Sequence, residues 1–119
     1  IVESRAQPNR LIWSYAVNGA ALSDKRLLID ADGFGALDGI AIDTKGRVWC
    51  GFGSGGQPGA DAAALDGVRV YSAEGKPLAH IHLPERCANL CFGGPKNNRL
   101  YMASCHSVYA LYVEAHGAV

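Results

Sequence analysis

The hydrophobic residues of this chain fall in short runs that are separated by turns rich in Gly, Asn and Asp. No window keeps the i, i+3, i+4, i+7 apolar spacing of an amphipathic helix, whereas short apolar runs bounded by turn residues are typical of β-strands. The pattern therefore predicts an all-β chain. The nine strands that it predicts are residues 11–17, 26–29, 39–42, 48–52, 68–71, 78–83, 88–92, 100–103 and 108–113.

Most segments between the predicted strands are short enough to be hairpin turns. They include residues 18–19, 43–46, 72–75 and 95–98, where Gly, Asn and Asp supply the backbone conformations of tight turns. We therefore expect meandering antiparallel sheets. The one long connection, residues 54–66, is rich in Gly and Ala and predicts a mobile surface loop of the kind that often borders a binding site.

The predicted strands repeat as a group along the chain. When the segments GIAIDTKGRVWCG and NLCFGGPKNNRLYMAS are aligned, Ile40 corresponds to Leu90 and Ile42 to Phe92, an offset of 50 residues. A turn, a strand with a bulky aromatic residue and a third strand follow in both cases. A repeat of about 50 residues with four strands is typical of one blade of a β-propeller.

The propeller interpretation divides the chain into three parts. Residues 1–34 would form the outer half of one blade, residues 35–84 a full blade, and residues 85–119 most of a further blade. Residues 40–42 and 90–92 are continuously apolar, as expected of inner strands covered on both faces. A ring typically needs at least about four blades, so we expect the remaining blades to come from missing sequence or from another chain.

The composition is that of an ordered globular protein, with 49% hydrophobic and 18% charged residues among 119. Eleven basic and eleven acidic residues cancel without forming runs, so we expect neither a nucleic-acid partner nor a membrane partner. The longest apolar stretches, such as residues 108–113, are too short to span a bilayer. The N-terminal IVESRAQPNR has no apolar core of a secretory signal. Localisation stays open, with the cytoplasm favoured.

Four cysteines, Cys50, Cys87, Cys91 and Cys105, are enough for two disulfides. Cys50 and Cys91 lie inside apolar strand patterns, where a free cysteine packs as a small hydrophobic residue. We therefore expect free, buried thiols. Disulfides and metal ligation are the alternatives.

Several segments resemble the gluconolactonase and senescence marker protein (regucalcin) family of six-bladed β-propellers, and the likeness covers most of residues 9–113. The segments that carry it are LDGIAIDTKGRVWCG, GVRVYSAEGKPLAHIHLP, ANLCFGG and RLYMAS. The resemblance implies that the chain is about two blades of a six-bladed β-propeller. In that family the stretch like LDGIAID begins an inner strand, and its Asp, here Asp38, binds a divalent metal at the mouth of the central tunnel.

The chain departs from the family pattern at one position, because Leu37 stands where the family has Pro before the Asp-Gly pair. The other metal ligands of the family, a Glu and one or two Asn, have no matching positions and are expected upstream of Ile1. Related phosphotriesterase-like propellers hold a second calcium with polar side chains where this chain has Ala41 and Cys91. We therefore expect no second metal site.

Asp38 is thus predicted to be both a metal ligand and a catalytic residue. Calcium is the expected metal, with zinc or manganese as alternatives. Calcium takes roughly six to eight oxygen ligands, so this chain alone cannot complete the site. The metal would polarise a lactone carbonyl and lower the pKa of a water molecule, from which Asp38 would accept a proton. The alternative is that Asp38 only turns the chain before a strand, with Gly39 supplying conformational freedom.

Asn89 opens the next inner strand at the corresponding place and is predicted to bind substrate through its side-chain amide. A structural role in a turn is the alternative. His80 and His82 have a spacing that would suit zinc, but their strand is the outermost of its blade, so we expect solvated edge histidines. Cys87 and Cys91 are spaced as C-x₃-C without a second pair, which favours packing over metal binding.

Two further motifs are discounted. Ser54 and His106 would suit a nucleophile and its base, but neither a G-x-S-x-G elbow nor a helix accompanies them. Residues 53–56 form a glycine-rich segment that lacks the Lys and the following helix of a phosphate-binding P-loop. We expect a flexible loop there.

The predicted function is the C-terminal part of a metal-dependent, gluconolactonase-like hydrolase, in which an activated water molecule attacks the carbonyl of a small sugar lactone. Two alternatives stay open, because propellers carry many unrelated functions. One is a non-catalytic propeller that serves as a binding scaffold, which would need no metal. The other is a phosphotriesterase-type hydrolase on the same fold.

Overall fold

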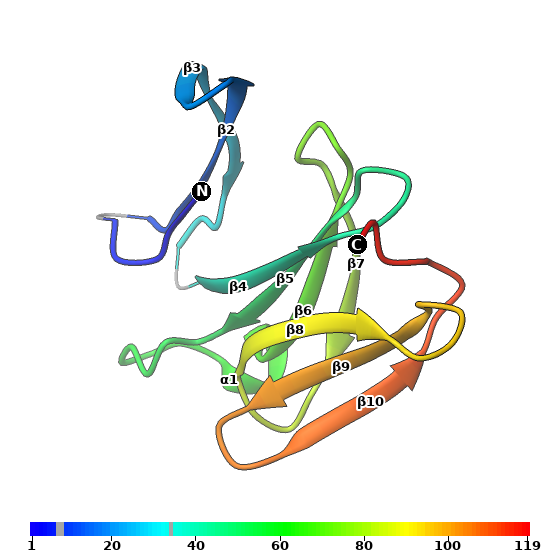
Figure 1. The fold of residues 1–119 in the computed structure, drawn as a ribbon. Helices are drawn as coiled ribbons and strands as arrows, with labels where there is room; N and C mark the ends of the chain where they lie inside the picture. The colour runs from blue at the N-terminus through cyan, green and yellow to red at the C-terminus, as the bar shows by residue number, and fades with distance from the viewer. Residues whose placement is uncertain (7–8, 34) are drawn as a thin grey trace.

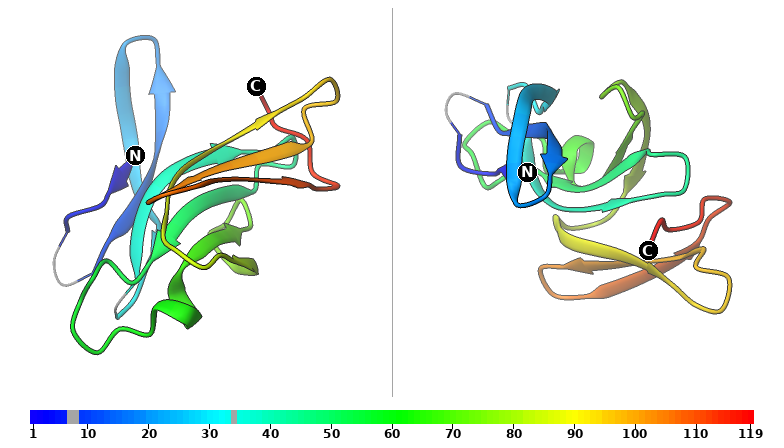
Figure 2. Two further views of the ribbon diagram at one scale, coloured as in Figure 1. Left: turned by 90° about the horizontal axis from the view of Figure 1, so that it is seen from below. Right: turned by 45° about the horizontal axis from the view of Figure 1, so that its top comes forward.

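The computed structural model describes residues 1–6, 9–33 and 35–119, which form three antiparallel sheets (Figure 1). The first sheet contains β1 (Val2–Glu3), β2 (Leu11–Asn18) and β3 (Ala21–Asp30). The second contains β4 (Ala36–Ile42), β5 (Val48–Gly53), β6 (Gly67–Tyr71) and β7 (Pro77–His82). The third contains β8 (Cys87–Gly93), β9 (Arg99–Ser104) and β10 (Val108–Tyr112). Figure 2 shows that the β2–β3 hairpin projects away from the other two sheets.

All nine predicted strands are confirmed, and they pair in chain order as antiparallel meanders. The strand β1 was not predicted, because two residues are too few to show a periodic pattern. The long connection at residues 54–66, predicted to be a surface loop, contains the short helix α1 (Ala62–Leu65). The Asp61 side chain caps α1 by accepting a hydrogen bond from Ala64 N.

The internal repeat is also confirmed by the sheet topology. β4 and β8 are the first strands of the second and third sheets, each is paired with the strand that follows it, and a third strand completes the shared pattern. β4 and β8 pack side by side between their sheets. Among the described ranges, no helix is long and apolar enough to cross a membrane.

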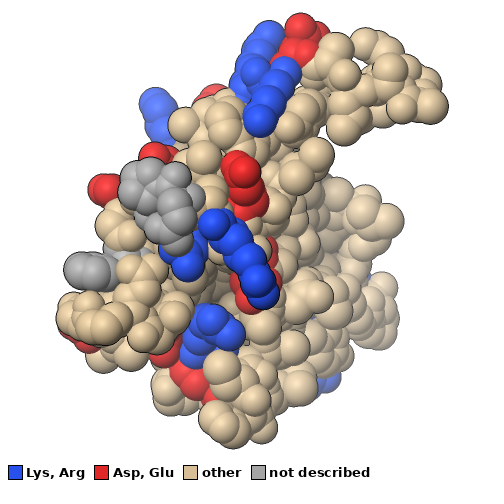
Figure 3. Space-filling model, turned by 90° about the vertical axis from the view of Figure 1, so that its left-hand side faces the viewer, with Lys and Arg blue, Asp and Glu red and all other residues tan. Residues whose placement is uncertain are grey.

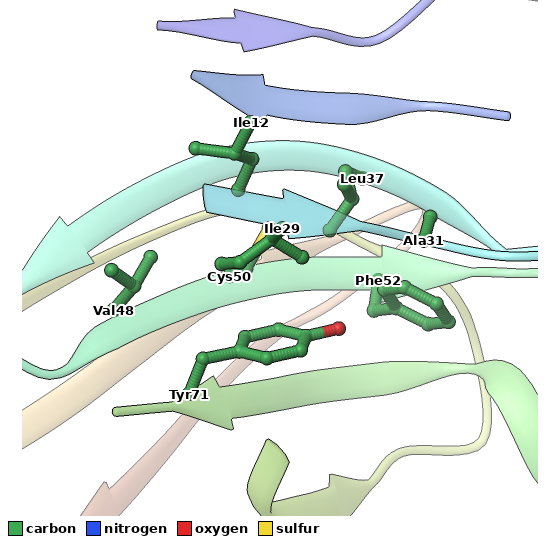
Figure 4. Packing of buried hydrophobic residues seen from close by; sticks show 8 residues of the cluster. All are labelled: Ile12, Ile29, Ala31, Leu37, Val48, Cys50, Phe52 and Tyr71. Atoms are coloured by element: carbon green, nitrogen blue, oxygen red, sulfur yellow. The ribbon is translucent and has the colours of Figure 1, made fainter. Parts of the chain in front are cut away.

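Two hydrophobic clusters hold the three sheets together, and β5 contributes to both. Val48, Cys50 and Phe52 face the first sheet, where Ile12 and Ile29 are directed toward them (Figure 4). Trp49 alternates with these residues, as strand geometry requires, and so belongs to the second cluster. That cluster lies between the second and third sheets and contains Trp49, Val68, Val70, Cys87, Leu90, Leu100, Met102 and Ala115.

The prediction of free, buried thiols is confirmed for Cys50 and Cys87 and is wrong about the burial of Cys91 and Cys105. All four are free thiols, and Cys50 and Cys87 are buried. Cys105, in the turn between β9 and β10, is exposed, and so is Cys91 within β8. The reason is the alternation of β8: Leu90 and Phe92 point into the second cluster, so Cys91 points to the opposite face of the third sheet.

Candidate functional site

Asp38 lies near the beginning of β4, where a β-bulge interrupts the strand. Leu37 pairs with Phe52 and Ile40 pairs with Cys50, so two residues of β4 stand opposite one residue of β5. A bulge bends its strand and redirects side chains, and bulges are frequent next to functional sites. Leu37 is fully buried and anchors the strand, while Asp38 is half-buried.

Asn89 lies at the corresponding place in β8, and its side chain rests against Gly39. β8 also carries a bulge, between Cys87 and Asn89. A Cβ atom on residue 39 would lie 2.2 Å from Asn89 Oδ1 and 2.9 Å from Asn89 Cα, so only glycine permits this approach. Asn89 Oδ1 accepts a 2.9 Å hydrogen bond from Leu90 N. The fold thus brings Asp38 and Asn89 to the same end of neighbouring strands.

Two buried cysteines lie behind this end of β4 and β8. Cys50 Sγ is 3.9 Å from the backbone oxygen of Asp38, and Cys87 Sγ is 3.3 Å from the backbone oxygen of Asn89. Burial raises the pKa of Cys50 to about 12 and the pKa of Cys87 to about 11. Both thiols therefore stay protonated near neutral pH and pack as hydrophobic residues rather than as thiolate ligands.

Asp38 borders a hollow of about 330 Å³. Three arginines border it: Arg5 and Arg10 from the β1–β2 connection, and Arg86 from the segment that leads into β8. Figure 3 shows this side of the molecule, where Lys and Arg side chains gather around the middle of the face. The residues that line the hollow are Ser4, Arg5, Arg10, Ala36, Leu37, Asp38, Gly55 and Arg86.

A second hollow, of about 400 Å³, adjoins the first at Gly55 and Arg86. Glu85 borders it and accepts hydrogen bonds from His106 N at 2.8 Å and from Tyr109 Oη at 3.0 Å, with His106 Nδ1 at 3.1 Å. Burial alone would raise the pKa of Glu85, but these hydrogen bonds outweigh it and lower that pKa.

Ser54 and His106, the discounted nucleophile and base, both border this second hollow. No hydrogen bond joins them in the described part of the chain. The Ser54 backbone N donates instead to Asp66 Oδ1 at 2.9 Å, and His106 is held by Glu85.

His80 and His82 lie on β7, the edge strand of the second sheet, three strands from β4. Their rings stack with centroids 4.0 Å apart, and His80 is half-buried near Phe52. Burial, assisted by His82 and Arg69, lowers the pKa of His80. Among the described residues, no three His, Cys, Asp or Glu side chains are grouped so that they could hold a metal ion.

The sequence interpretation did not single out Arg5, Arg10, Arg86 or Glu85. A partial signal existed for Glu85 and Arg86, because they immediately precede β8, the strand that corresponds to the Asp38 strand β4 in the internal repeat. No pattern in the sequence signals Arg5 or Arg10, because they reach Asp38 only through the packing of the first sheet on the second.

Comparison with known proteins shows which protein family this chain matches. Residues 5–106 match the family described as the SMP-30/Gluconolactonase/LRE-like region. The chain is 30% identical over 96 residues to regucalcin from Danio rerio, an alignment that covers 79% of this chain and 30% of that protein. The chain thus spans about a third of the length of this relative.

Solved structures show the same fold. A gluconolactonase from Xanthomonas campestris matches 84% of this chain with a TM-score of 0.66 at 24% identity, over 29% of its own length. A luciferin-regenerating enzyme matches 92% of this chain with a TM-score of 0.69 at 20% identity, over 39% of its own length. At these identities the likeness to solved structures concerns the fold alone.

Proposed function

The chain belongs to the SMP-30/gluconolactonase/LRE-like family, and on that basis we propose that it is part of a metal-dependent lactone hydrolase. We assign the three sheets to successive blades of a six-bladed β-propeller, with residues 1–34 as the outer part of one blade, 35–84 as a full blade and 85–119 as most of the next. The observation that carries the proposal is the placement of Asp38 and Asn89 on adjacent inner strands, at the same end and each beside a bulge.

The residues present fit part of a site for a hard divalent cation. The Asp38 carboxylate offers oxygen ligands of the type that calcium prefers, and Asp38 borders a polar hollow. Calcium is the proposed metal, and zinc or manganese are the alternatives. Its remaining ligands would come from other parts of the ring, because a single carboxylate falls well short of the roughly six oxygens that calcium requires. When bound, the cation supplies polarisation of the lactone carbonyl.

Asp38 would act as the proton acceptor in the reaction. The oxygen of a water molecule forms a bond to the lactone carbonyl carbon while Asp38 accepts its proton. The ring carbon–oxygen bond then breaks, and the proton passes to the leaving ring oxygen. The net reaction consumes one water and yields an open-chain hydroxy acid, and a positioned base of this kind contributes roughly 10²- to 10⁴-fold to the rate.

Asn89 would bind and orient the substrate. Because its Oδ1 accepts the Leu90 N–H, the amide oxygen is engaged within the protein and the amide NH₂ group is the part suited to a ligand. Asn89 therefore fits hydrogen bonding to a substrate hydroxyl or ring oxygen better than it fits metal ligation.

The test uses the full encoded protein and a neutral sugar lactone, with and without a chelator and with calcium, zinc or manganese added back. We expect chelation to abolish hydrolysis and D38N to lower kcat by roughly 10²-fold or more. D61N is the matched control, since Asp61 is exposed and Asn caps a helix as well as Asp. Full activity in D38N would exclude the proposed role of Asp38.

Two other results would redirect the assignment. A folded protein that binds small molecules but hydrolyses no lactone would favour the scaffold function. Hydrolysis of a phosphotriester in preference to a lactone, measured in parallel, would favour a phosphotriesterase-type reaction on the same residues.

A further inference from the structure

The hollow at Asp38 carries an excess of positive charge. Arg5, Arg10 and Arg86 border it, and Asp38 is the only acidic residue that does so in the part of the chain that the structure describes. Among the described residues none of these three arginines forms an ion pair with a carboxylate. Positive side chains without anionic partners around a cleft attract and hold anions.

We propose that this hollow selects lactones that carry an oxyanion, a carboxylate or a phosphate, and that Arg86 binds that group. The inference rests on the proposed lactone hydrolysis and specifies its substrate class. A divalent cation at Asp38 would add positive charge to the same hollow, which strengthens the preference for an anionic substrate.

Arg86 is held in place by its aliphatic stem, which lies on Gly53. A Cβ atom on residue 53 would lie between 2.2 and 2.7 Å from the Cβ, Cγ and Cδ atoms of Arg86, so glycine at this position makes room for the stem. The fixed stem limits the freedom of the guanidinium, which lowers the entropy lost when it binds a ligand.

The guanidinium of Arg86 is shielded yet incompletely paired. Its Nε is buried and has no hydrogen-bond partner in the described part of the structure. An unpaired buried donor is costly, so the guanidinium is not fully engaged by the described part of the protein. Arg86 also borders both hollows, so it lies beside Asp38 and next to the space that a substituent on the lactone ring would enter.

Guanidinium chemistry fits the proposed group. An arginine presents a planar fork of N–H donors that matches the two oxygens of a carboxylate or phosphate, and such charge-assisted pairs are about twice as strong as neutral hydrogen bonds. Arg10, whose Nε donates to Ser4 O at 2.9 Å, and Arg5 add long-range attraction.

The experiment measures kcat/KM of the full encoded protein on two matched pairs of lactones. D-Glucono-1,4-lactone and D-glucaro-1,4-lactone differ only by a carboxylate at C6, whereas D-glucono-1,5-lactone and its 6-phosphate differ only by a phosphate. We expect the anionic member of at least one pair to be preferred by roughly 10-fold or more, and the pair that shows the preference identifies the oxyanion.

The R86M variant keeps the stem over Gly53 and removes only the guanidinium. We expect it to lower the ratio of anionic to neutral kcat/KM by roughly 10- to 100-fold, with R86K showing a smaller loss because it retains the charge without the fork. R26M is the control, since Arg26 is exposed on β3 and borders neither hollow. Circular dichroism confirms that each variant folds.

Equal rates on both members of each pair, or an equal loss on both in R86M, would overturn the inference while leaving lactone hydrolysis intact. If no lactone is hydrolysed, the proposed function fails, and calorimetric binding of glucarate against glucitol, its neutral polyol counterpart, decides the inference separately. Tighter binding of glucarate that R86M abolishes would support the oxyanion site; equal binding would exclude it.

Discussion

The indole Nε1 of Trp49 donates a 2.9 Å hydrogen bond to Oδ2 of Asp43, a carboxylate that is 1% exposed. Arg47 Nε donates to the same oxygen at 2.6 Å, and the backbone N–H groups of Lys45 and Arg47 donate to Oδ1. Burial alone would raise the pKa of Asp43, but the hydrogen bonds from Trp49, Arg47 and Lys45 outweigh it and lower that pKa. This network fixes the β4–β5 turn to the core between the second and third sheets.

D43A is expected to destabilise the protein by about 2–4 kcal/mol, because it leaves the buried Trp49 N–H without an acceptor. Urea denaturation of the full encoded protein measures the effect. E114Q serves as the control, since Glu114 is exposed on the nearby C-terminal segment. A D43A variant as stable as the E114Q variant would show that the network contributes little to folding.

The stability of the protein is expected to rise with pH as the pH approaches 6.5 from below, and His80 contributes to this dependence. Its pKa in the folded protein lies below the ordinary value of 6.5 because of burial, His82 and Arg69, so the unfolded chain binds more protons in that window. The contribution of His80 is fully present above pH 6.5 and is lost as the pH falls toward its folded pKa.

Thermal unfolding of H80Q measured from pH 5 to pH 8 is expected to show a flatter dependence than that of the unmodified protein. A79S, at an exposed position on the same strand that does not titrate, is expected to keep the original slope. Identical slopes for all three proteins would show that His80 titrates alike in the folded and unfolded states.

G39A is expected to lower both stability and lactone hydrolysis. The added methyl group would collide with the side chain and the backbone of Asn89, forcing β4 and β8 apart at the proposed site, and overpacking of this kind costs about 1–3 kcal/mol. G93A is the comparison, because its Cβ would meet only the edge of the Tyr101 ring, at 3.1 Å. Equal activity in both variants would argue against close packing at Asn89 as a requirement for function.

Cysteine alkylation tests the proposed ring. Iodoacetamide at pH 8 is expected to label Cys105 in the full encoded protein and to spare Cys50 and Cys87, which are fully buried with raised pKa values. Cys91 is exposed on the outer face of the third sheet, and a neighbouring blade packed on that face would protect it. Mass spectrometry that finds Cys91 labelled as fast as Cys105 would contradict a blade in that position.

The sequence by itself determined the strands and the position of the proposed catalytic residue. Turn residues and short apolar runs are local signals. The repeat of 50 residues is visible because Ile40 and Leu90 both pack into a hydrophobic cluster from the first strand of successive sheets. Asp38 could be found because a motif, LDGIAID, lies within one continuous stretch. The sequence did not predict β1 and α1, because these elements are too short to produce a periodic pattern.

The tertiary structure alone decided what surrounds Asp38. Arg5 and Arg10 come from the β1–β2 connection and Arg86 from a segment far along the chain, and they meet at one hollow only because the first and third sheets pack beside the second. The burial of Asp43 beneath Trp49 and the exposure of Cys91 likewise depend on which face of a strand another sheet covers. A sequence records the alternation of faces along a strand, but side-chain burial is set by the neighbour that packs on each face, and that neighbour is known only after the chain has folded.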